Sequence, residues 1–370
     1  MREIKDNVNN QENQEKIRLE LQTKELNKII QDLSKNIKKH PVEILRNIQI
    51  SAQDKHIIFR STDLEVEITY FFETEQEIKI DPILIESNEL SNLIKNYPNE
   101  KINFEFQNEK LIIEGEDLSA TIPLKQDPNF PDPIDTSKAQ PKSINFNLIK
   151  QAIEKVISSS SQSSDSKMSG VNFKTKEKTL TIAATDGFRL AIFKINLDEE
   201  IDMNFTISKK CAQEVIKFDA TVPISYQTQT HWVLSTHEKM LSVKKLNYEY
   251  PNYEKAIPSD NKYKFYINRE DFIKKLIFTS SQSEIVKISL KDNTLNIQSS
   301  DSRIKTKTLI KSVEEVKDIE FLFKSSYLID GLKIFDEEEV LFTYKDENKP
   351  ITLENNINTT YITLPARPER

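Results

Sequence analysis

Residues 184–191, near the middle of the 370-residue sequence, read ATDGFRLA. The prediction of the fold starts from this stretch. Largely apolar runs at 180–183 and 192–193 flank the stretch, so it reads as a tight turn joining two β-strands. Asp186 tolerates the positive φ that such a turn requires, and Gly187 adopts it readily. The chain contains only four glycines, so a glycine here indicates a demand of the backbone. The stretch predicts a β-hairpin.

The same pattern occurs three times along the chain. In each copy a short β-type run ends in a hydroxyl-bearing residue followed by aspartate, at Asp63, Asp186 and Asp301. Successive aspartates are separated by about the length of one ordinary domain. An aromatic residue followed by proline also recurs, at 130–131 and 250–251, each time after a pair of predicted strands. The simplest interpretation is one structural unit repeated three times.

Composition limits the class of protein. The length suffices for two or three domains with ordinary cores. We find neither an apolar run near the ~20 residues of a membrane span nor a secretory leader, so we expect a cytoplasmic protein without membrane contact. The single cysteine, Cys211, excludes an intrachain disulfide framework and fits a reducing compartment. Because the net charge is −7, the surface as a whole does not indicate nucleic-acid binding.

Hydrophobic periodicity predicts an α+β fold in three similar domains. Residues 1–15 are polar and lack a hydrophobic period, so we expect a disordered extension there. The predicted domains cover 16–135, 136–258 and 259–370. Each reads as strand, helix, several strands, helix and several strands, which gives about six βαβββ half-units. The expected helices lie at 22–39, 87–96, 148–158, 209–218, 269–279 and 324–335.

Positive charge is concentrated on these predicted helices. The segment 22–39 carries five lysines against Glu25 and Asp32, and 209–218 carries three lysines against Glu214. One interpretation is that the lysines solvate the outer faces of amphipathic helices. The other is that six helices around one axis form a cationic lining, as sequence-independent binding to a phosphate backbone requires. The charge pattern alone leaves both open.

Four phrases in the chain resemble the bacterial DNA polymerase III β sliding clamp family. They are STDLEVE at 61–67, ATDGFRLA at 184–191, YPNYEKAIP at 250–258 and YITLPAR at 361–367. Each phrase alone is a weak signal, but the four occur in the family's order and accompany a threefold repeat. The resemblance covers residues 16–368.

The resemblance implies a fold and a set of partners. The family forms a head-to-tail homodimer in which each chain is half of a ring, with two helices per domain inside and β-sheets outside. Duplex DNA of any sequence would pass through the ring. The resemblance further implies binding to the replicative polymerase catalytic subunit, the clamp loader and other proteins with a clamp-binding motif, in the cytoplasm at the nucleoid. It implies neither a catalytic site nor a cofactor or metal.

The resemblance also implies a hydrophobic pocket for partner peptides between the second and third domains. Apolar side chains and proline would form a dry slot for aliphatic anchors, while turn backbone and basic rim residues orient an extended peptide. Phe188 stands where the family usually has histidine, and Lys255 and Ala256 replace the usual Arg and Val. The implied pocket residues are Met168, Gly170, Thr185, Gly187, Phe188, Arg189, Leu190, Pro251, Lys255, Ala256, Tyr327, Ile362, Leu364, Pro365, Ala366 and Arg367.

On the DNA side, the basic positions are only partly those of the family. Asn88 and Glu89 fall where basic residues are usual. Three lysines match DNA-facing positions of the family, and three more lie on predicted helices. The expected DNA-facing residues are Lys39, Lys95, Lys150, Lys167, Lys209 and Lys210.

The aspartates of the repeat offer one enzymatic alternative. Asp63, Asp186 and Asp301 could serve as carboxylate ligands in a metal-dependent hydrolase of nucleic acid. The repeat spacing, however, puts them in three different domains, which favours a role in forming turns. His231 and His237 lack a nearby third ligand, so a surface pair is the simpler interpretation.

Overall fold

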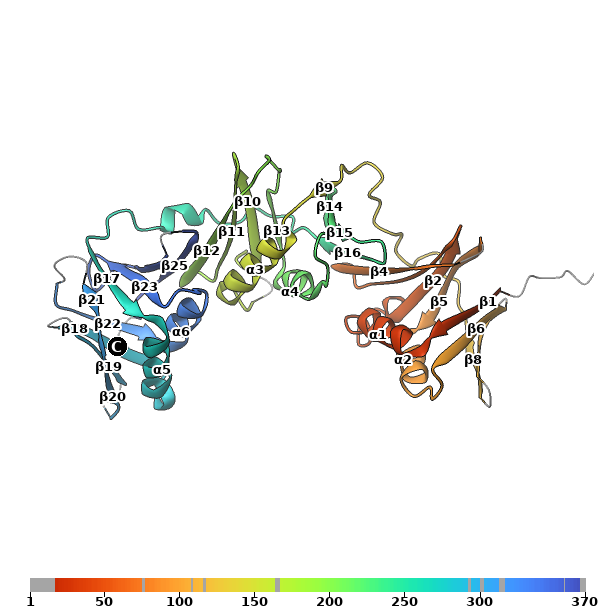
Figure 1. Ribbon diagram of the computed structural model, residues 1–370, viewed down its shortest axis with the longest axis horizontal. Helices are drawn as coiled ribbons and strands as arrows, with labels where there is room; N and C mark the ends of the chain where they lie inside the picture. The colour runs from red at the N-terminus through yellow and green to blue at the C-terminus, as the bar shows by residue number, and fades with distance from the viewer. Residues whose placement is uncertain are drawn as a thin grey trace, which may run out of the picture. The chain divides into compact units, whose positions relative to one another are not determined.

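The computed structural model describes residues 17–74, 77–107, 109–115, 118–163, 167–291, 294–299, 303–312, 317–355 and 357–366 (Figure 1). The predicted extension at 1–15 lies outside these residues. The chain divides into two compact units, the first comprising Met1–Asp135 with Ser235–Ser242 and the second Thr136–Leu234 with Val243–Arg370. The described helices include none long and apolar enough to cross a membrane.

The first unit contains two βαβββ half-units. The first half-unit consists of β1 (Ile17–Gln22), α1 (Thr23–Ser34), β2 (Asn47–Gln53), β3 (His56–Thr62) and β4 (Val66–Glu73). The second consists of β5 (Ile80–Glu86), α2 (Ser87–Lys95), β6 (Lys101–Gln107), β7 (Lys110–Glu114) and β8 (Ser119–Pro123).

The second unit contains four more half-units of the same plan. The first two of these comprise β9 (Lys142–Ser143), α3 (Phe146–Val156), β10 (Val171–Lys176), β11 (Thr179–Thr185) and β12 (Arg189–Asn196), then β13 (Phe205–Ile207), α4 (Lys209–Lys217), β14 (Ile224–Gln227), β15 (His231–Ser235) and β16 (Lys239–Lys244). Residues Ser235–Ser242, which include the turn between β15 and β16 and most of β16, belong to the first unit. The last two comprise β17 (Tyr263–Asn268), α5 (Arg269–Thr279), β18 (Ile285–Lys291), β19 (Thr294–Ser299), β20 (Lys305–Leu309) and β21 (Lys311–Ser312), then β22 (Ile319–Lys324), α6 (Ser325–Lys333), β23 (Glu339–Tyr344), β24 (Ile351–Glu354) and β25 (Thr359–Thr363).

Half-units are joined in pairs by exchange of their first strands. In the first unit β1 pairs with β6, whereas β5 pairs with β2. The same exchange pairs β13 with β10, β9 with β14, β22 with β18 and β17 with β23. All of these pairings are antiparallel. Three helix pairs pack together as a result: α1 with α2, α3 with α4 and α5 with α6 (Figure 1).

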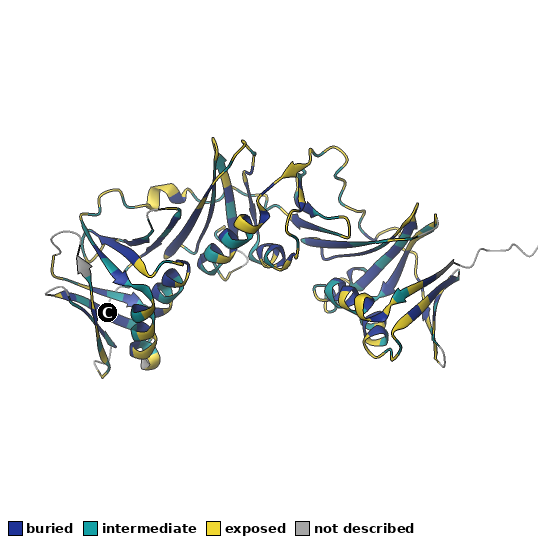
Figure 2. Ribbon diagram, in the orientation of Figure 1, coloured by how far each residue is buried: buried dark blue, intermediate teal, exposed yellow. Residues whose placement is uncertain are grey.

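Each helix buries one face against the strands. In α1 the buried positions include Leu26, Ile29, Ile30 and Leu33, which recur at the helical period. Figure 2 shows exposed residues alternating with buried ones along the helices. The α+β class and the six predicted helices are confirmed within the described residues. The limits of the three domains remain a prediction.

Two details of the sequence prediction need correction. The helix expected at 22–39 ends at Ser34, where the hydroxyl donates a 2.5 Å hydrogen bond to the Ile30 carbonyl and turns follow. Ile37 is only 1% exposed. This buried residue extends the apolar spacing of α1 beyond the end of the helix, which is why the sequence predicted a longer helix. The leading strands β5, β13 and β22 were not individually predicted. One is only three residues long and another contains a proline, so neither gives a clear alternating pattern.

Candidate functional site

The turn at Asp186 has the conformation that its sequence predicts. The Asp186 carboxylate oxygen Oδ1 accepts hydrogen bonds from the backbone amides of Phe188 and Arg189, each at 3.0 Å. Gly187 has a φ of +89°, in the left-handed region that favours glycine. The turn joins antiparallel strands β11 and β12 and leaves Phe188 60% exposed. A large aromatic side chain is thus presented at the surface.

A second described copy of the turn has the same hydrogen bonds. Asp63 Oδ1 accepts from the amides of Glu65 at 3.0 Å and Val66 at 2.8 Å, and Leu64 has a φ of +71°. The predicted turn-forming role is therefore confirmed for Asp63 and Asp186, while Asp301 lies outside the described residues. The first two aspartates also belong to different units.

The last described residues are held against the Asp186 turn. Strand β25 pairs with β12, with Leu190 opposite Ile362. Beyond the strand, the Leu364 amide donates a 2.9 Å hydrogen bond to the Phe188 carbonyl, and the Ala366 amide donates one of 2.7 Å to the Leu322 carbonyl. Residues 364–366 are thereby fixed between the turn and strand β22.

These segments form an apolar pocket of about 580 Å³. Five of its residues were expected from the family resemblance, and Ile285 and Lys324 were missed. Those two lie opposite each other where β18 begins and β22 ends, and no local motif marks either one. The only sequence signal for Lys324 is its position three residues before Tyr327, across a helix start. The pocket is lined by Phe188, Ile285, Lys324, Tyr327, Leu364, Pro365 and Ala366.

Lys324 places a positive charge at this pocket. Its ammonium lies 5.6 Å from the centre of the Tyr327 ring and 3.2 Å from the Glu284 carboxylate. The Tyr327 carbonyl in turn accepts a 2.6 Å hydrogen bond from the hydroxyl of Tyr361, a fully buried residue. Burial raises the pKa of Tyr361, so its hydroxyl stays protonated as a donor.

Arg189 is a buried connecting residue. We expected its guanidinium at the rim of the pocket, but the side chain is only 8% exposed. Its nitrogens lie 3.1 Å from the Asp186 carboxylate, 2.6 Å from the Asp330 carboxylate and 2.7 Å from the Ser158 carbonyl. The guanidinium carbon also lies 4.4 Å from the centre of the Tyr327 ring. Arg189 therefore joins the turn, helix α6 and the segment after α3.

Several other expected residues lie behind the pocket wall. Leu190 and Ile362 belong to a buried cluster with Ala183, Ile192 and Tyr253. The Thr185 amide donates a 3.0 Å hydrogen bond to the Tyr250 hydroxyl, and Tyr250 packs against the same cluster. The aromatic residue before Pro251 thus closes over the strands that carry the turn.

The other expected residues that the structure describes do not line this pocket. Gly187 lies next to Met168, while Gly170 lies so close to the Ile207 carbonyl that a Cβ atom would be 2.3 Å from that oxygen. Pro251 lines a separate cavity of about 530 Å³. Lys255 and Ala256 are exposed in the 3₁₀ helix Tyr253–Ala256. Arg367 lies outside the described residues.

The expected DNA-facing lysines differ in their exposure. Lys39, Lys95, Lys167 and Lys210 are exposed, whereas Lys150 and Lys209 are partly buried. Burial, and then the neighbouring Arg189, lower the pKa of Lys209. In the described part of the chain, we find no group of three or more His, Cys, Asp or Glu side chains arranged to hold a metal ion.

Comparison with known proteins places this architecture in one family. Models for the DNA polymerase III beta subunit match its N-terminal domain at residues 17–128, its central domain at 143–252 and its C-terminal domain at 254–367. The Beta sliding clamp of Bacillus subtilis is 24% identical over 367 residues, covering 91% of this chain and 96% of that protein.

Solved structures agree with the fold. A sliding clamp from Pseudomonas aeruginosa bound to griselimycin has a TM-score of 0.86 at 19% identity, covering 95% of this chain and 100% of that one. The Helicobacter pylori beta clamp bound to a DNA ligase peptide has a TM-score of 0.84 at 18% identity, with the same two coverages.

Proposed function

Because the chain belongs to the DNA polymerase III beta subunit family, the sliding clamps of DNA replication, we propose that two copies close into a ring around duplex DNA. The chain is a sliding clamp and acts as a processivity factor. The observation that carries the ring proposal is the threefold repeat, in which each matched region contains one pair of packed helices. A ring made of such repeats retains DNA by topology.

Contacts with DNA need only be weak in such a ring. Four of the six expected lysines are exposed, so phosphates can approach them at the surface. Contacts of this kind are independent of base sequence and weaken as salt rises. They permit sliding, because no single register along the duplex is favoured.

The homodimer would form through exposed strand edges. In the described residues, β8 ends one sheet of the first unit, and β20 ends one sheet of the second. A groove of about 400 Å³ beside β8 is lined by Leu93, Tyr97 and Leu118 among others, and Leu309 at the end of β20 is 81% exposed. Unpaired strand edges with apolar side chains favour pairing with another chain. We propose that β8 of one protomer pairs with β20 of its partner.

The pocket at Phe188 and Leu364 would receive partner peptides. Its walls are mainly apolar, with Tyr327 and Pro365 as rigid surfaces and Lys324 as a cation. Such a pocket suits a short extended peptide with aliphatic or aromatic anchors. The partners would be the replicative polymerase catalytic subunit, the clamp loader and other proteins that carry a clamp-binding motif. The structure of the Helicobacter pylori beta clamp bound to a DNA ligase peptide supports peptide binding as a function of this chain.

Retention on DNA tests the ring directly. The protein is loaded onto a closed circular duplex by a clamp loader, free protein is removed, and the retained fraction is measured before and after a single cut by a restriction enzyme. We expect stable retention on the circle and rapid release once the DNA is linear. Equal retention on the circular and linear forms would contradict a topological link.

No observation favours the enzymatic alternative. The Asp63 and Asp186 carboxylates accept hydrogen bonds within their own turns, and the comparisons give no support to a metal-dependent hydrolase. We therefore expect no cleavage of DNA on addition of Mg²⁺. Cleavage that depends on metal and is lost in Asp186→Ala would instead support the alternative.

A further inference from the structure

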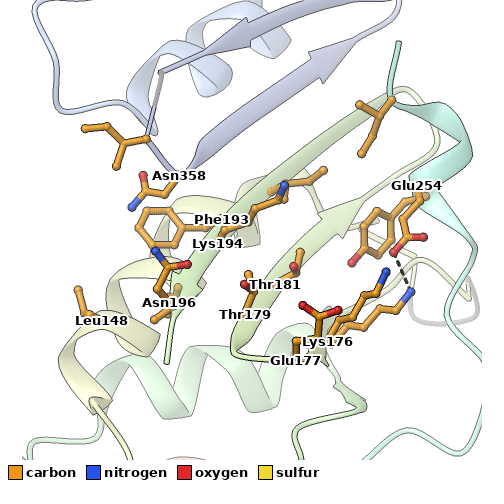
Figure 3. Close-up of a pocket in the computed structure, with 16 residues that line it drawn as sticks. Leu148, Lys176, Glu177, Thr179, Thr181, Phe193, Lys194, Asn196, Glu254 and Asn358 are labelled. Atoms are coloured by element: carbon orange, nitrogen blue, oxygen red, sulfur yellow. Dashed lines mark hydrogen bonds and ion pairs between the residues drawn. The ribbon is translucent and has the colours of Figure 1, made fainter. Parts of the chain in front are cut away.

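One face of strands β10, β11 and β12 carries a group of lysines and threonines that do not line the peptide pocket. The antiparallel register puts Lys174 opposite Thr181, and Thr181 opposite Lys194, so these three side chains share one face. Lys176 and Thr179 form the next row. Figure 3 shows Thr179, Thr181 and Lys194 on neighbouring strands, with Lys176 beside Glu177. We call Lys174, Lys176, Thr179, Thr181 and Lys194 the lysine shelf; all five line a cavity of about 720 Å³.

A buried apolar cluster lies between the lysine shelf and the peptide pocket. Along β12, Leu190 and Ile192 belong to the buried apolar cluster, and Lys194 follows on the same face. Phe188, at the near end of the strand, lines the pocket. The distance from Phe188 to Lys194 is about 20 Å at the rise of an extended strand. Tyr253 covers the cluster between them and also lines the shelf cavity.

The charge of the shelf favours an anionic partner. Of its three lysines, Lys174 lies 2.7 Å from the Glu254 carboxylate, and the charge of Lys176 also acts on that carboxylate without a direct ion pair. Lys176 and Lys194 are exposed, and neither ammonium has an ion pair or hydrogen bond within the described chain. Glu177 and Glu254 are the only carboxylates that line the cavity, while the threonines add hydroxyl donors. Two ammonium groups and two hydroxyls thus remain available.

We propose that the lysine shelf binds an acidic segment of the same partner whose apolar anchors occupy the pocket at Phe188 and Leu364. The proposal rests on the proposed peptide-binding function of that pocket and extends it to a second contact. Apolar anchors would supply most of the affinity, whereas the shelf would distinguish partners by the charge of the sequence beside the anchors. Because the shelf is exposed, its contribution is modest and falls as salt rises.

The test uses fluorescent synthetic peptides and the full-length chain. One peptide carries the aliphatic and aromatic anchors alone. Other peptides carry in addition four glutamates or four glutamines at the N-terminal or the C-terminal end. A Gly-Ser spacer of two or eight residues separates these added residues from the anchors. An eight-residue spacer reaches up to about 28 Å, enough to pass Tyr253, whereas two residues span at most about 7 Å. Dissociation constants are measured by fluorescence anisotropy at low and high NaCl.

We expect the long-spacer glutamate peptide to bind about three to ten times more tightly than its glutamine counterpart at low salt, from two exposed ion pairs. This advantage should vanish in K176E/K194E, in high salt and with the short spacer. The control variant K262E/K349E makes the same change in net charge at exposed lysines away from the shelf and should keep the advantage. The anchor-only peptide should bind all three proteins equally.

The outcomes separate the shelf from the pocket. Equal binding of the glutamate and glutamine peptides to the unaltered chain would overturn the shelf proposal while leaving the pocket intact. An advantage that persists in K176E/K194E would overturn it as well. If K176E/K194E weakened DNA retention and left peptide discrimination unchanged, the shelf would belong to nucleic-acid binding. Failure of the anchor-only peptide to bind the unaltered chain would overturn the pocket itself, and the shelf proposal with it.

Discussion

The Arg189 guanidinium lies 2.6 Å from the Asp330 carboxylate, and this ion pair joins the turn after β11 to helix α6. The two residues stand beside the pocket walls. Phe188 directly precedes Arg189, and the Tyr327 ring lies 4.4 Å from the guanidinium carbon. A single buried cation therefore fixes the spacing of two aromatic walls of the pocket. Its loss should affect stability and binding together.

Removal of Asp330 should loosen the pocket. In Asp330→Ala the Arg189 guanidinium keeps its hydrogen bonds to the Asp186 carboxylate and the Ser158 carbonyl. It loses its shortest contact, the one to Asp330. We expect the free energy of unfolding to fall by about 1 to 3 kcal/mol, as for other charged hydrogen bonds, because Arg189 stays buried. Anchor peptide affinity should fall several-fold. Urea denaturation and fluorescence anisotropy measure the two effects, and Asp198→Ala, at an exposed aspartate, serves as the control. Unchanged peptide affinity would show that the ion pair does not shape the pocket.

The C-terminal segment should contribute directly to peptide binding. In Leu364→Ala/Pro365→Ala the pocket loses two apolar wall residues, while the backbone contact between Leu364 and Phe188 remains possible. We expect at least about a tenfold loss of peptide affinity, in the range found for apolar anchors at interfaces. The dimer measured by light scattering should persist. Val222→Ala, at a side chain 70% exposed, controls for the loss of apolar surface. Peptide binding equal to that of the unaltered chain would argue against this pocket.

Lysines in the first unit should contribute to DNA retention. Lys39 and Lys95 are both exposed, one in the turns after α1 and the other at the end of α2. We expect Lys39→Glu/Lys95→Glu to slow loading onto circular DNA and to reduce the salt dependence of retention, since contacts with phosphates are lost. Lys79→Glu/Lys110→Glu makes the same charge change at other exposed lysines of the unit. Equal loading of the two double variants would mean that Lys39 and Lys95 do not face DNA.

Repetition made most of the fold predictable. The Asp186 turn was predictable because aspartate followed by glycine is a clear turn signal, and the Asp63 turn because it repeats the same pattern. Both turns have the expected hydrogen bonds. The helices were identified by apolar period. That signal failed at Ile37, which is buried by packing beyond the end of α1. The spacing of apolar residues indicates which side chains are buried. The helix itself ends at Ser34, where the hydrogen-bonding pattern changes.

The pocket was only partly predictable. Phe188 and Leu364 lie in recognisable phrases, whereas Ile285 and Lys324 reach the pocket through strand pairing between segments that share no motif. The role of Arg189 was also hidden, because its partners Asp330 and Ser158 are distant in sequence. Exchange of first strands between half-units brings such residues together. A pattern read along the chain does not contain that information.

The first unit should lose stability in acid through Asp32. Asp32 on α1 lies 2.7 Å from the ammonium groups of Lys35 and Lys239 and accepts a hydrogen bond from Tyr70. Burial raises the Asp32 pKa, but Lys239 and then Lys35 outweigh it and lower the pKa to about 2, from an ordinary value of 3.8. A lowered folded-state pKa means that the stabilisation is complete above about pH 4 and is lost as the pH falls through 2. Asp32→Asn should therefore lower the free energy of unfolding by about 1 to 2 kcal/mol at neutral pH, and the deficit should narrow from pH 4 downward. Urea denaturation from neutral pH down to about pH 2 measures both proteins. A deficit in the free energy of unfolding that stays constant over this range would contradict the stabilising role of the Asp32 carboxylate.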